Sequence, residues 1–339
     1  MVRAGIVGIS GYSGKVVFEL LLKHSQARVT YVCANNTEGR LDQIWPQFKG
    51  RTDLVCAKFS VDKACELCDI IFLALPHTES MRVVPALLKK GKKVIDLSAD
   101  YRLEDQKVYE KWYGHTHEDS KNLENSVYGL PELYREKIKK ATLLANPGCY
   151  PTAAILGLAP LVATNHKAIQ SMIIDAKSGV SGAGKKVVAE LLFGQVDENF
   201  KAYKVLKHQH TPEINQYLSR LGERQVEVTF VAHLLPIFQG ILETIYVQLN
   251  GSLSFEDITK IYQKFYKTET FVRMMDSGVQ PEVKNVAGTN FCDIGLVLSE
   301  DKKTLVIVSV IDNLVKGAAG QAVQNFNIMN GFKETESLL

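Results

Sequence analysis

The feature that most constrains the fold of this chain is an alternation of short apolar runs with helical patterns over its first hundred residues. The runs typical of strands cover residues 4–9, 27–34, 69–76 and 92–98, and the helical patterns cover residues 15–24 and 81–91. Strands and helices that alternate at such short spacing form right-handed crossovers between parallel strands. The sequence therefore predicts an α/β fold that begins with a Rossmann-like parallel sheet.

The pattern changes near Cys149. A helical stretch at 151–163 is followed by longer strand-like runs with few helices between them, at 170–184, 226–237, 240–249 and 303–312. Runs of this kind predict a second, mixed α+β domain built around a sheet. We therefore expect a first domain over 1–148 and a second over 149–312. The tail, 313–332, is predicted to be a helix rich in small residues that ends near Gly331.

Composition narrows the class of protein. Of 339 residues, 46% are hydrophobic and 23% charged, which excludes collagen-like and disordered chains. The net charge is only +3 and no run of five basic residues occurs, so we expect neither a nucleic-acid partner nor a membrane-surface partner. No signal peptide or long apolar span is visible, and six scattered cysteines are typical of a reducing compartment. These features predict a cytoplasmic protein.

A glycine-rich loop lies between the first predicted strand and the first predicted helix. Glycines at this place permit a tight turn and let backbone N–H groups approach a phosphate at the positive end of the helix. The spacing is G-x-x-G-x-x-G instead of the usual G-x-G-x-x-G, and taken alone it is also compatible with a plain turn. Its position in the first βαβ unit favours a dinucleotide site, which we expect to include Gly8, Ser10, Gly11, Tyr12, Ser13 and Gly14.

The end of the second predicted strand favours NADP over NAD. An NAD site usually has an acidic residue here to bind the ribose 2′-OH. This chain has Asn35, which offers neutral hydrogen bonds, and Arg40, which offers a cation for a 2′-phosphate. Glu38 argues against this assignment, and Arg40 could equally be an ordinary solvated charge.

Cys149 is the candidate nucleophile. It follows an apolar run and a Pro-Gly turn, and a predicted helix begins directly after it. A thiol at a helix start meets unpaired N–H groups, which favour the thiolate and could also bind an oxyanion. The alternative is a buried structural cysteine. Cys65 and Cys68 form a C-x-x-C pair, which we interpret as a helix face because no second pair accompanies it.

His208 and His210 are the best candidates for a base beside the thiol. They stand in HQHTPEI, where Thr211 and Pro212 begin a predicted helix, and they would share one side of an extended segment. We prefer His210 as the acid/base because it lies at the turn; His208 could be a surface residue. No third ligand in register accompanies the pair, so we expect no metal site. His77 is a lesser candidate because it follows a strand of the first domain, at the ligand edge.

The sequence resembles the N-acetyl-gamma-glutamyl-phosphate reductases of arginine biosynthesis. The resemblance rests on nine separated segments in one order: GISGYSG (8–14), ALPH (74–77), DLSADYRL (96–103), YGLPE (128–132), NPGCYPT (146–152), SGVSGAG (178–184), HQHTPEI (208–214), GTNFCDIG (288–295) and DNLVKGAAGQAVQN (312–325). It implies a Rossmann domain that binds NADPH, a catalytic and oligomerisation domain, and a C-terminal helix, 313–332, that returns to the first domain. It also implies a homodimer or homotetramer.

The resemblance also implies a mechanism and roles for individual residues. Cys149 would attack the carbonyl of an acyl phosphate and expel phosphate, leaving a thioester that accepts hydride. His210 would move the protons, and Arg102 and His208 would bind substrate, although Arg102 could instead make a loop salt bridge. Cofactor contacts are implied for Ser181, Gly182, Ala183 and Asn313, for which a plain structural turn is the alternative.

Three other functions stay open at this point. The chain could be a related acyl-phosphate reductase, either an aspartate-semialdehyde dehydrogenase or an enzyme acting on carrier-bound aminoadipyl phosphate. It could be a Cys/His acyl hydrolase that uses no nicotinamide. It could also be a nucleotide-binding sensor that has kept only the fold.

Overall fold

The computed structural model describes all residues from Met1 to Leu339, and the chain divides into two compact units. Unit 1 comprises Met1–Pro147 and Ala318–Leu339, and unit 2 comprises Gly148–Gly317. Unit 1 resumes at Ala318, later than the predicted 313 and inside the π-helical turn Val315–Ala319 that precedes the last helix. No helix is long and apolar enough to cross a membrane.

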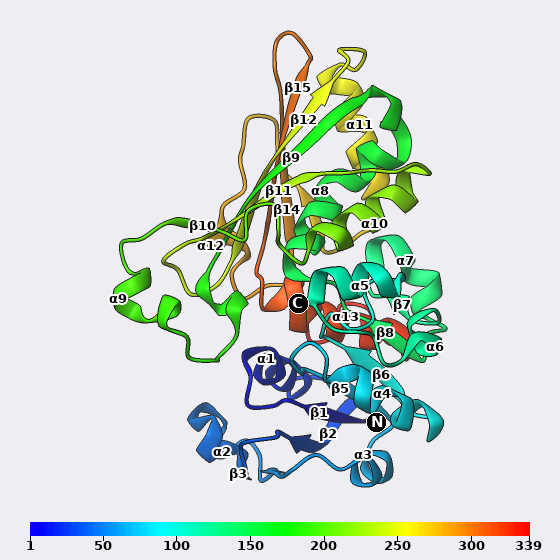
Figure 1. The fold of residues 1–339 in the computed structure, drawn as a ribbon, viewed down its shortest axis with the longest axis vertical. Helices are drawn as coiled ribbons and strands as arrows, with labels where there is room; N and C mark the ends of the chain where they lie inside the picture. Colours follow the sequence, from blue (N-terminus) through cyan, green and yellow to red (C-terminus); the bar gives the residue numbers. More distant parts are fainter. The chain divides into compact units, whose positions relative to one another are not determined.

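A six-stranded sheet with every neighbouring pair parallel is the centre of unit 1, in the order β2-β1-β5-β6-β8-β7 (Figure 1). Its strands are β1 Val2–Val7, β2 Ala27–Cys33, β5 Ile70–Leu73, β6 Lys93–Asp96, β7 Val127–Tyr128 and β8 Leu143–Ala145. A short antiparallel pair, β3 Gly39–Arg40 and β4 Val55–Cys56, forms a second sheet. The predicted parallel sheet is confirmed.

The helices of unit 1 are α1 Tyr12–Leu21, α2 Leu41–Ile44, α3 Val61–Leu67, α4 Ser80–Lys89, α5 Gln106–Tyr113, α6 Ser120–Leu123, α7 Pro131–Ile138 and α13 Gly320–Met329. The C-terminal helix α13 is almost wholly buried, and Val323 and Phe326 belong to the same apolar cluster as Ile6 of β1. The last helix therefore completes the core of unit 1. It is shorter than the predicted 313–332 because Asn330 caps it before Gly331, whose φ is +69°.

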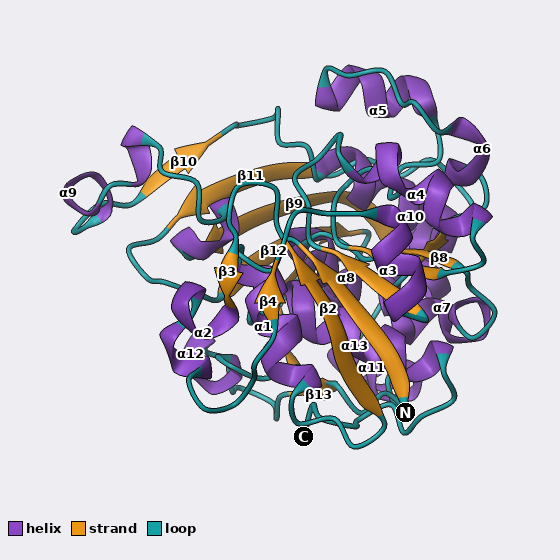
Figure 2. Cartoon of the chain, turned by 90° about the horizontal axis from the view of Figure 1, so that it is seen from below, coloured by secondary structure: helices purple, strands orange, loops and turns teal.

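Unit 2 is built on a seven-stranded mixed sheet in the order β10-β11-β9-β12-β15-β14-β13. The strands are β9 Ile169–Ser178, β10 Lys201–Tyr203, β11 Thr229–Leu234, β12 Ile241–Leu249, β13 Val272–Met274, β14 Cys292–Leu298 and β15 Thr304–Ile311. The pairs β9–β11 and β13–β14 are parallel and the remaining neighbours are antiparallel. Figure 2 shows the long strands in orange and the helices in purple.

The helices of unit 2 are α8 Cys149–Asn165, α9 Phe193–Val196, α10 Thr211–Gly222, α11 Phe255–Phe265 and α12 Val283–Val286. Helix α8 is apolar on all sides, and thirteen of its residues are buried. A helix of this composition is typical of a core position. Gly157 permits close packing there, since a Cβ would come within 2.9 Å of Ile245 Cδ1 on β12. The helix that starts at Cys149 is thus fixed against the sheet.

Candidate active site

The glycine-rich loop of unit 1 connects β1 to α1 at the carboxyl edge of the parallel sheet. Gly8 has φ +94°, and a Cβ on it would come within 2.2 Å of Ala74 O. A Cβ on Gly14 would come within 2.4 Å of Gly8 O. Helix α1 has Gly11 as its N-cap and no side chain caps it. The loop therefore offers a close approach to the positive helix end, the arrangement that suits a pyrophosphate.

The residues predicted to select the ribose lie beyond the end of β2. Asn35 is exposed, so its amide is accessible to a cofactor that binds from solvent. Arg40 is half exposed and its guanidinium binds the Asp42 carboxylate at 2.8–3.0 Å, which raises the pKa of Arg40 through that hydrogen bond. An exposed pair of this kind is weak and easily exchanged. A role for Arg40 in binding a 2′-phosphate stays a prediction.

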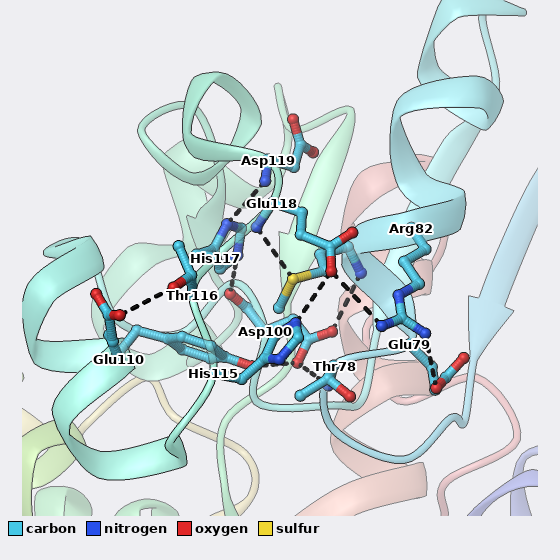
Figure 3. Close-up of polar contacts among 12 residues, drawn as sticks. Thr78, Glu79, Arg82, Asp100, Glu110, His115, Thr116, His117, Glu118 and Asp119 are labelled. Atoms are coloured by element: carbon cyan, nitrogen blue, oxygen red, sulfur yellow. Dashed lines mark hydrogen bonds and ion pairs between the residues drawn. The ribbon is translucent and has the colours of Figure 1, made fainter.

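A polar network fixes the turn that follows β5, and Figure 3 shows it in close-up. Asp100 accepts hydrogen bonds from the N–H groups of Thr78 (2.7 Å) and Met81 (3.1 Å) and from the Tyr109 hydroxyl (2.9 Å). Thr78 has φ +74°, a costly conformation for a β-branched residue. Backbone strain at the ligand edge of such a sheet is a feature of functional sites, and it occurs here beside His77, which is exposed.

Arg102 lies within unit 1 and is only 5% exposed. Its Nε donates to Asn146 O and its Nη2 donates to Leu97 O, both at 2.8 Å. These contacts join the end of β6 to the segment after β8, so they give the guanidinium a structural role. Substrate binding by Arg102 stays a prediction.

Cys149 is the first residue of α8 and is partly exposed, as a nucleophile must be. The N-cap is Gly148, again without a capping side chain. Gly317 allows a second segment to approach closely, because a Cβ on it would come within 2.8 Å of Cys149 Cβ. The thiol therefore stands at an uncapped helix start, where the backbone amides favour a thiolate and an oxyanion.

Glu213 is a site residue that sequence reasoning missed. It lies in the first turn of α10, it is 1% exposed, and its Oε1 accepts a hydrogen bond of 2.8 Å from the Gly148 N–H. The contact spans 65 positions of the chain and fixes the residue before Cys149. An acidic residue in the first turn of a helix is usually explained by the helix dipole. The position of Glu213 in the sequence therefore gave no sign that it binds the Gly148 N–H.

The two candidate histidines lie together, although their segment is not a strand. His210 is the N-cap of α10, and its N–H donates to His208 Nδ1 at 3.2 Å. The ring centroids are 4.9 Å apart. The suggestion that His208 is a surface residue is wrong: it is 7% exposed and its ring packs against Tyr150, Tyr203 and Phe230.

This packing gives the two histidines different properties. Burial, with a smaller effect of the Lys204 charge, lowers the pKa of His208 to about 4, so its ring is neutral near pH 7. Because Nδ1 accepts a hydrogen bond, the ring proton belongs on Nε2. His210 is less buried, and its ring also lies 5.9 Å from that of Tyr150. The acid/base role of His210 and the substrate contact of His208 stay predictions.

Two tyrosines complete this cluster, and the sequence offered no signal for either. The hydroxyls of Tyr150 and Tyr203 are 3.1 Å apart. Burial raises the pKa of Tyr203 to about 12; the hydrogen bond with Tyr150 lowers this pKa in part, and Cys149 adds a smaller rise. Tyr203 therefore stays protonated and can donate a hydrogen bond close to the thiol.

The loop at 178–184 is held by backbone contacts within unit 2. Ser181 N–H donates to Phe238 O at 2.9 Å. Asn313 accepts from Gly240 N–H at 2.6 Å and donates to Ser181 Oγ at 3.0 Å, which gives its amide a structural role. Gly182 and Ala183 are exposed. Cofactor contacts of all four residues stay predictions.

The predicted site residues are divided between the two units. Unit 1 contains the glycine loop, Asn35, Arg40 and Arg102; unit 2 contains Cys149, both histidines, the 181–183 turn and Asn313. The residues present in unit 1 fit a dinucleotide: an uncapped helix start, glycines that keep the turn too tight for a Cβ, and an exposed asparagine after β2. When bound, a nicotinamide cofactor supplies hydride.

Comparisons with known proteins find a family model for each unit. Residues 3–141 match the family model described as semialdehyde dehydrogenase, NAD binding domain, and residues 149–313 match semialdehyde dehydrogenase, dimerisation domain. The aspartate semialdehyde dehydrogenase of Candida albicans, solved with NADP, has a TM-score of 0.72 at 16% identity, over 97% of this chain and 98% of that one. That likeness concerns the fold.

Relatives of higher identity carry a more specific name. N-acetyl-gamma-glutamyl-phosphate reductase from Desulfotalea psychrophila is 47% identical over all of this chain and 98% of its own length. The enzyme of that name from Desulforamulus reducens is 44% identical, also over all of this chain and 98% of its own. With full-length identity at this level and an uncapped helix start beneath Cys149, the chain belongs to the N-acetyl-gamma-glutamyl-phosphate reductase family.

Proposed function

We propose that this protein reduces N-acetyl-gamma-glutamyl phosphate with NADPH to N-acetyl-glutamate 5-semialdehyde and phosphate, a step of arginine biosynthesis. The observation that carries the proposal is the place of Cys149: a partly exposed thiol at the uncapped start of α8, with His210 on the neighbouring segment. The full-length identity to reductases of that name supports the choice of substrate over other acyl phosphates.

The residues of unit 2 would act in sequence. The Cys149 thiolate forms a bond to the acyl carbon, and the carbon–oxygen bond to phosphate breaks, so that a thioester and inorganic phosphate result. Hydride addition to the thioester carbon gives a hemithioacetal, which releases the aldehyde and restores the thiolate. His210 holds the proton that moves at the tetrahedral oxygen, and the amides at the start of α8 stabilise that oxygen.

Mass spectrometry of the intact chain, mixed with the acyl phosphate in the absence of reductant, tests the first step. We expect one acyl adduct, located on Cys149 and absent from Cys149→Ser. The same variant should still bind NADPH, because its glycine loop is intact. A pure hydrolase would form the adduct without binding NADPH, and a sensor would lose nothing on Cys149→Ser; either result would reject the proposal.

Phosphate-dependent oxidation of candidate semialdehydes with NADP tests the substrate. We expect turnover with N-acetyl-glutamate semialdehyde and much less with aspartate semialdehyde or a carrier-bound aminoadipate semialdehyde. The reverse preference would assign the chain to one of the related reductases. None of the six cysteines forms a disulfide, as suits an enzyme of the cytoplasm that works through a thiol.

The oligomer we propose is a homodimer, or a homotetramer containing it, formed through the open face of the unit 2 sheet. Ile173, Tyr246, Val306 and Val297 are register neighbours across β9, β12, β15 and β14, which places them in one apolar row. Ile173, Tyr246 and Val297 are more than a third exposed. A contiguous apolar row of this kind is typical of an interface. Light scattering should give a dimer or tetramer, and Tyr246→Lys should shift it towards the monomer.

A further inference from the structure

Glu243 is a carboxyl group in the interior of unit 2 that the proposed chemistry does not use. It lies on β12, the middle strand of the seven-stranded sheet, and it is 0% exposed. Neither of its carboxylate oxygens has a hydrogen-bond partner. Buried acids are almost always paired or hydrogen-bonded, so this placement is unusual for a charged group.

The carboxyl faces helix α8. Glu243 pairs in register with Ala176 on β9 and Ser309 on β15, whose side chains lie on the same face. The Ser309 hydroxyl donates to Ala153 O, one helical turn after Cys149. Two strand positions further, Ile245 contacts Gly157 of the same helix. Glu243 is therefore enclosed between the sheet and the first turns of α8.

No cation is available to this carboxyl on its own face of the sheet. The charged group that acts on Glu243 is Lys177. Its register partner on β12 is Leu242, the residue before Glu243, so the two side chains lie on opposite faces of the sheet. Lys177 Nζ is 2.6 Å from an Asp175 carboxylate oxygen. Thr244 also accepts from that ammonium. Burial raises the pKa of Glu243 well above its usual range, and the Lys177 charge offsets only part of this effect.

The other elements packed here contribute no cation. Cys149 and Tyr150 are the titratable residues in the first turn of α8, and burial raises the pKa of Tyr150 far beyond the neutral range. Tyr262 of α11 donates to Gly157 O, and Cys292 of β14 lies 3.5 Å from the Ser309 hydroxyl. None of them neutralises a carboxylate.

We propose that Glu243 is a protonated carboxylic acid in the native fold and that its ionisation at alkaline pH is a conformational switch, which loosens α8 from the sheet and so disturbs the start of the helix at Cys149. An unpaired carboxylate in this apolar layer is strongly disfavoured, so its formation favours a conformation in which water reaches the carboxylate. The pKa is raised on folding, so the stabilisation is complete at acidic pH and is lost as pH rises through the native pKa.

Infrared spectroscopy measures the protonation state directly. With glutamate labelled by ¹³C at the carboxyl carbon, we expect the C=O band of a carboxylic acid at about pH 7, absent from Glu243→Gln and retained in Glu300→Gln, a matched change at an exposed glutamate of the same unit. A wild-type spectrum without this band would overturn the proposal even if the Glu243 variant failed to fold.

Thermal unfolding and thiol labelling test the switch. Between about pH 7 and about pH 9 the wild-type Tm should fall by roughly 2 to 4 °C more than that of Glu243→Gln. Labelling of Cys149 by a thiol reagent should accelerate with pH more steeply in the wild type, whereas thiol ionisation itself is common to both proteins. Equal pH profiles for wild type and Glu243→Gln would reject the switch. No readout requires turnover, so the result is independent of the proposed reaction.

Discussion

At the scale of single residues, the site depends on buried side chains that hold backbone groups. Glu213 binds the Gly148 N–H and Asp100 binds two N–H groups after β5, so each carboxylate fixes a turn that carries a candidate functional residue. Hydrogen bonds to charged acceptors are worth roughly 1.5 to 3 kcal/mol each. These acids position the residues that would meet substrate or cofactor.

Replacement of Glu213 tests this positioning role. We expect Glu213→Ala to lower kcat by roughly tenfold to a hundredfold, because Gly148 and the thiol after it lose their support. NADPH affinity should be unchanged. Glu213→Gln keeps an oxygen for the Gly148 N–H and should recover part of the loss in steady-state kinetics. Equal losses in both variants would indicate a role for the charge itself.

Asp96 makes the stability of unit 1 depend on pH in the acidic range. It is fully buried and accepts from Ser80 and Ser98. Burial, followed by the charge of Asp100, raises the pKa of Asp96 to about 6. Since the native pKa lies above the unfolded one, the contribution to stability is complete below about pH 4 and is lost as pH rises through about 6.

Asp96→Asn mimics the protonated acid and removes this dependence. We expect the variant to gain stability relative to the wild type as pH rises from about 4 to about 7, by on the order of 1 to 3 kcal/mol. Denaturant unfolding at several pH values measures the difference. A constant difference over this range would contradict the assignment of the titration to Asp96.

At the scale of elements, the turn between β1 and α1 contains one glycine that the backbone requires and one that it does not require. Gly8 has a positive φ and no room for a Cβ, whereas a Cβ on Gly11 would make only an ordinary contact, 3.5 Å from Gly8 O. We expect Gly8→Ala to lower Tm and weaken NADPH binding together. Gly11→Ala should leave Tm almost unchanged. Calorimetry and equilibrium cofactor binding measure both, and an unaffected Gly8→Ala would contradict the turn.

Local sequence patterns predicted many of the helices and strands of this protein, but they could not predict contacts between segments that are distant in the sequence. The parallel sheet of unit 1, the helix after Cys149 and strands β9, β11, β12 and β15 of unit 2 follow from apolar periodicity, which acts over a few residues; β10, β13 and β14 were not predicted. Glu213 and Tyr203 escaped prediction because their partners, Gly148 and Tyr150, are more than fifty positions away. His208 was misjudged because its aromatic neighbours come from three separate segments.

At the scale of the whole molecule, each unit has its own core and its own sheet. The chain leaves unit 1 at Pro147 and re-enters it at Ala318, and within unit 1 the Asn146 side chain donates to Ala318 O at 3.0 Å. The two ends of unit 2 are also neighbours, because Gly317 lies against Cys149. Each unit therefore begins and ends at one place.

A shortened chain tests the independence of unit 1. Residues 1–147 joined by a short glycine linker to 318–339 should fold, with α13 in place, and should bind NADPH without any reductase activity. Circular dichroism, a cooperative melt and cofactor titration give the result. The matched chain that lacks 318–339 should be unstable, since it loses Val323 and Phe326 from the core. Folding of both chains alike would show that α13 is dispensable.

The neighbouring ends of unit 2 have a further consequence for engineering. A module whose entry and exit coincide can be grafted as a cassette, since the host needs to open only one bond to accept it. Unit 2, with its thiol, could thus be inserted into another nucleotide-binding domain as a single segment whose ends are Gly148 and Gly317.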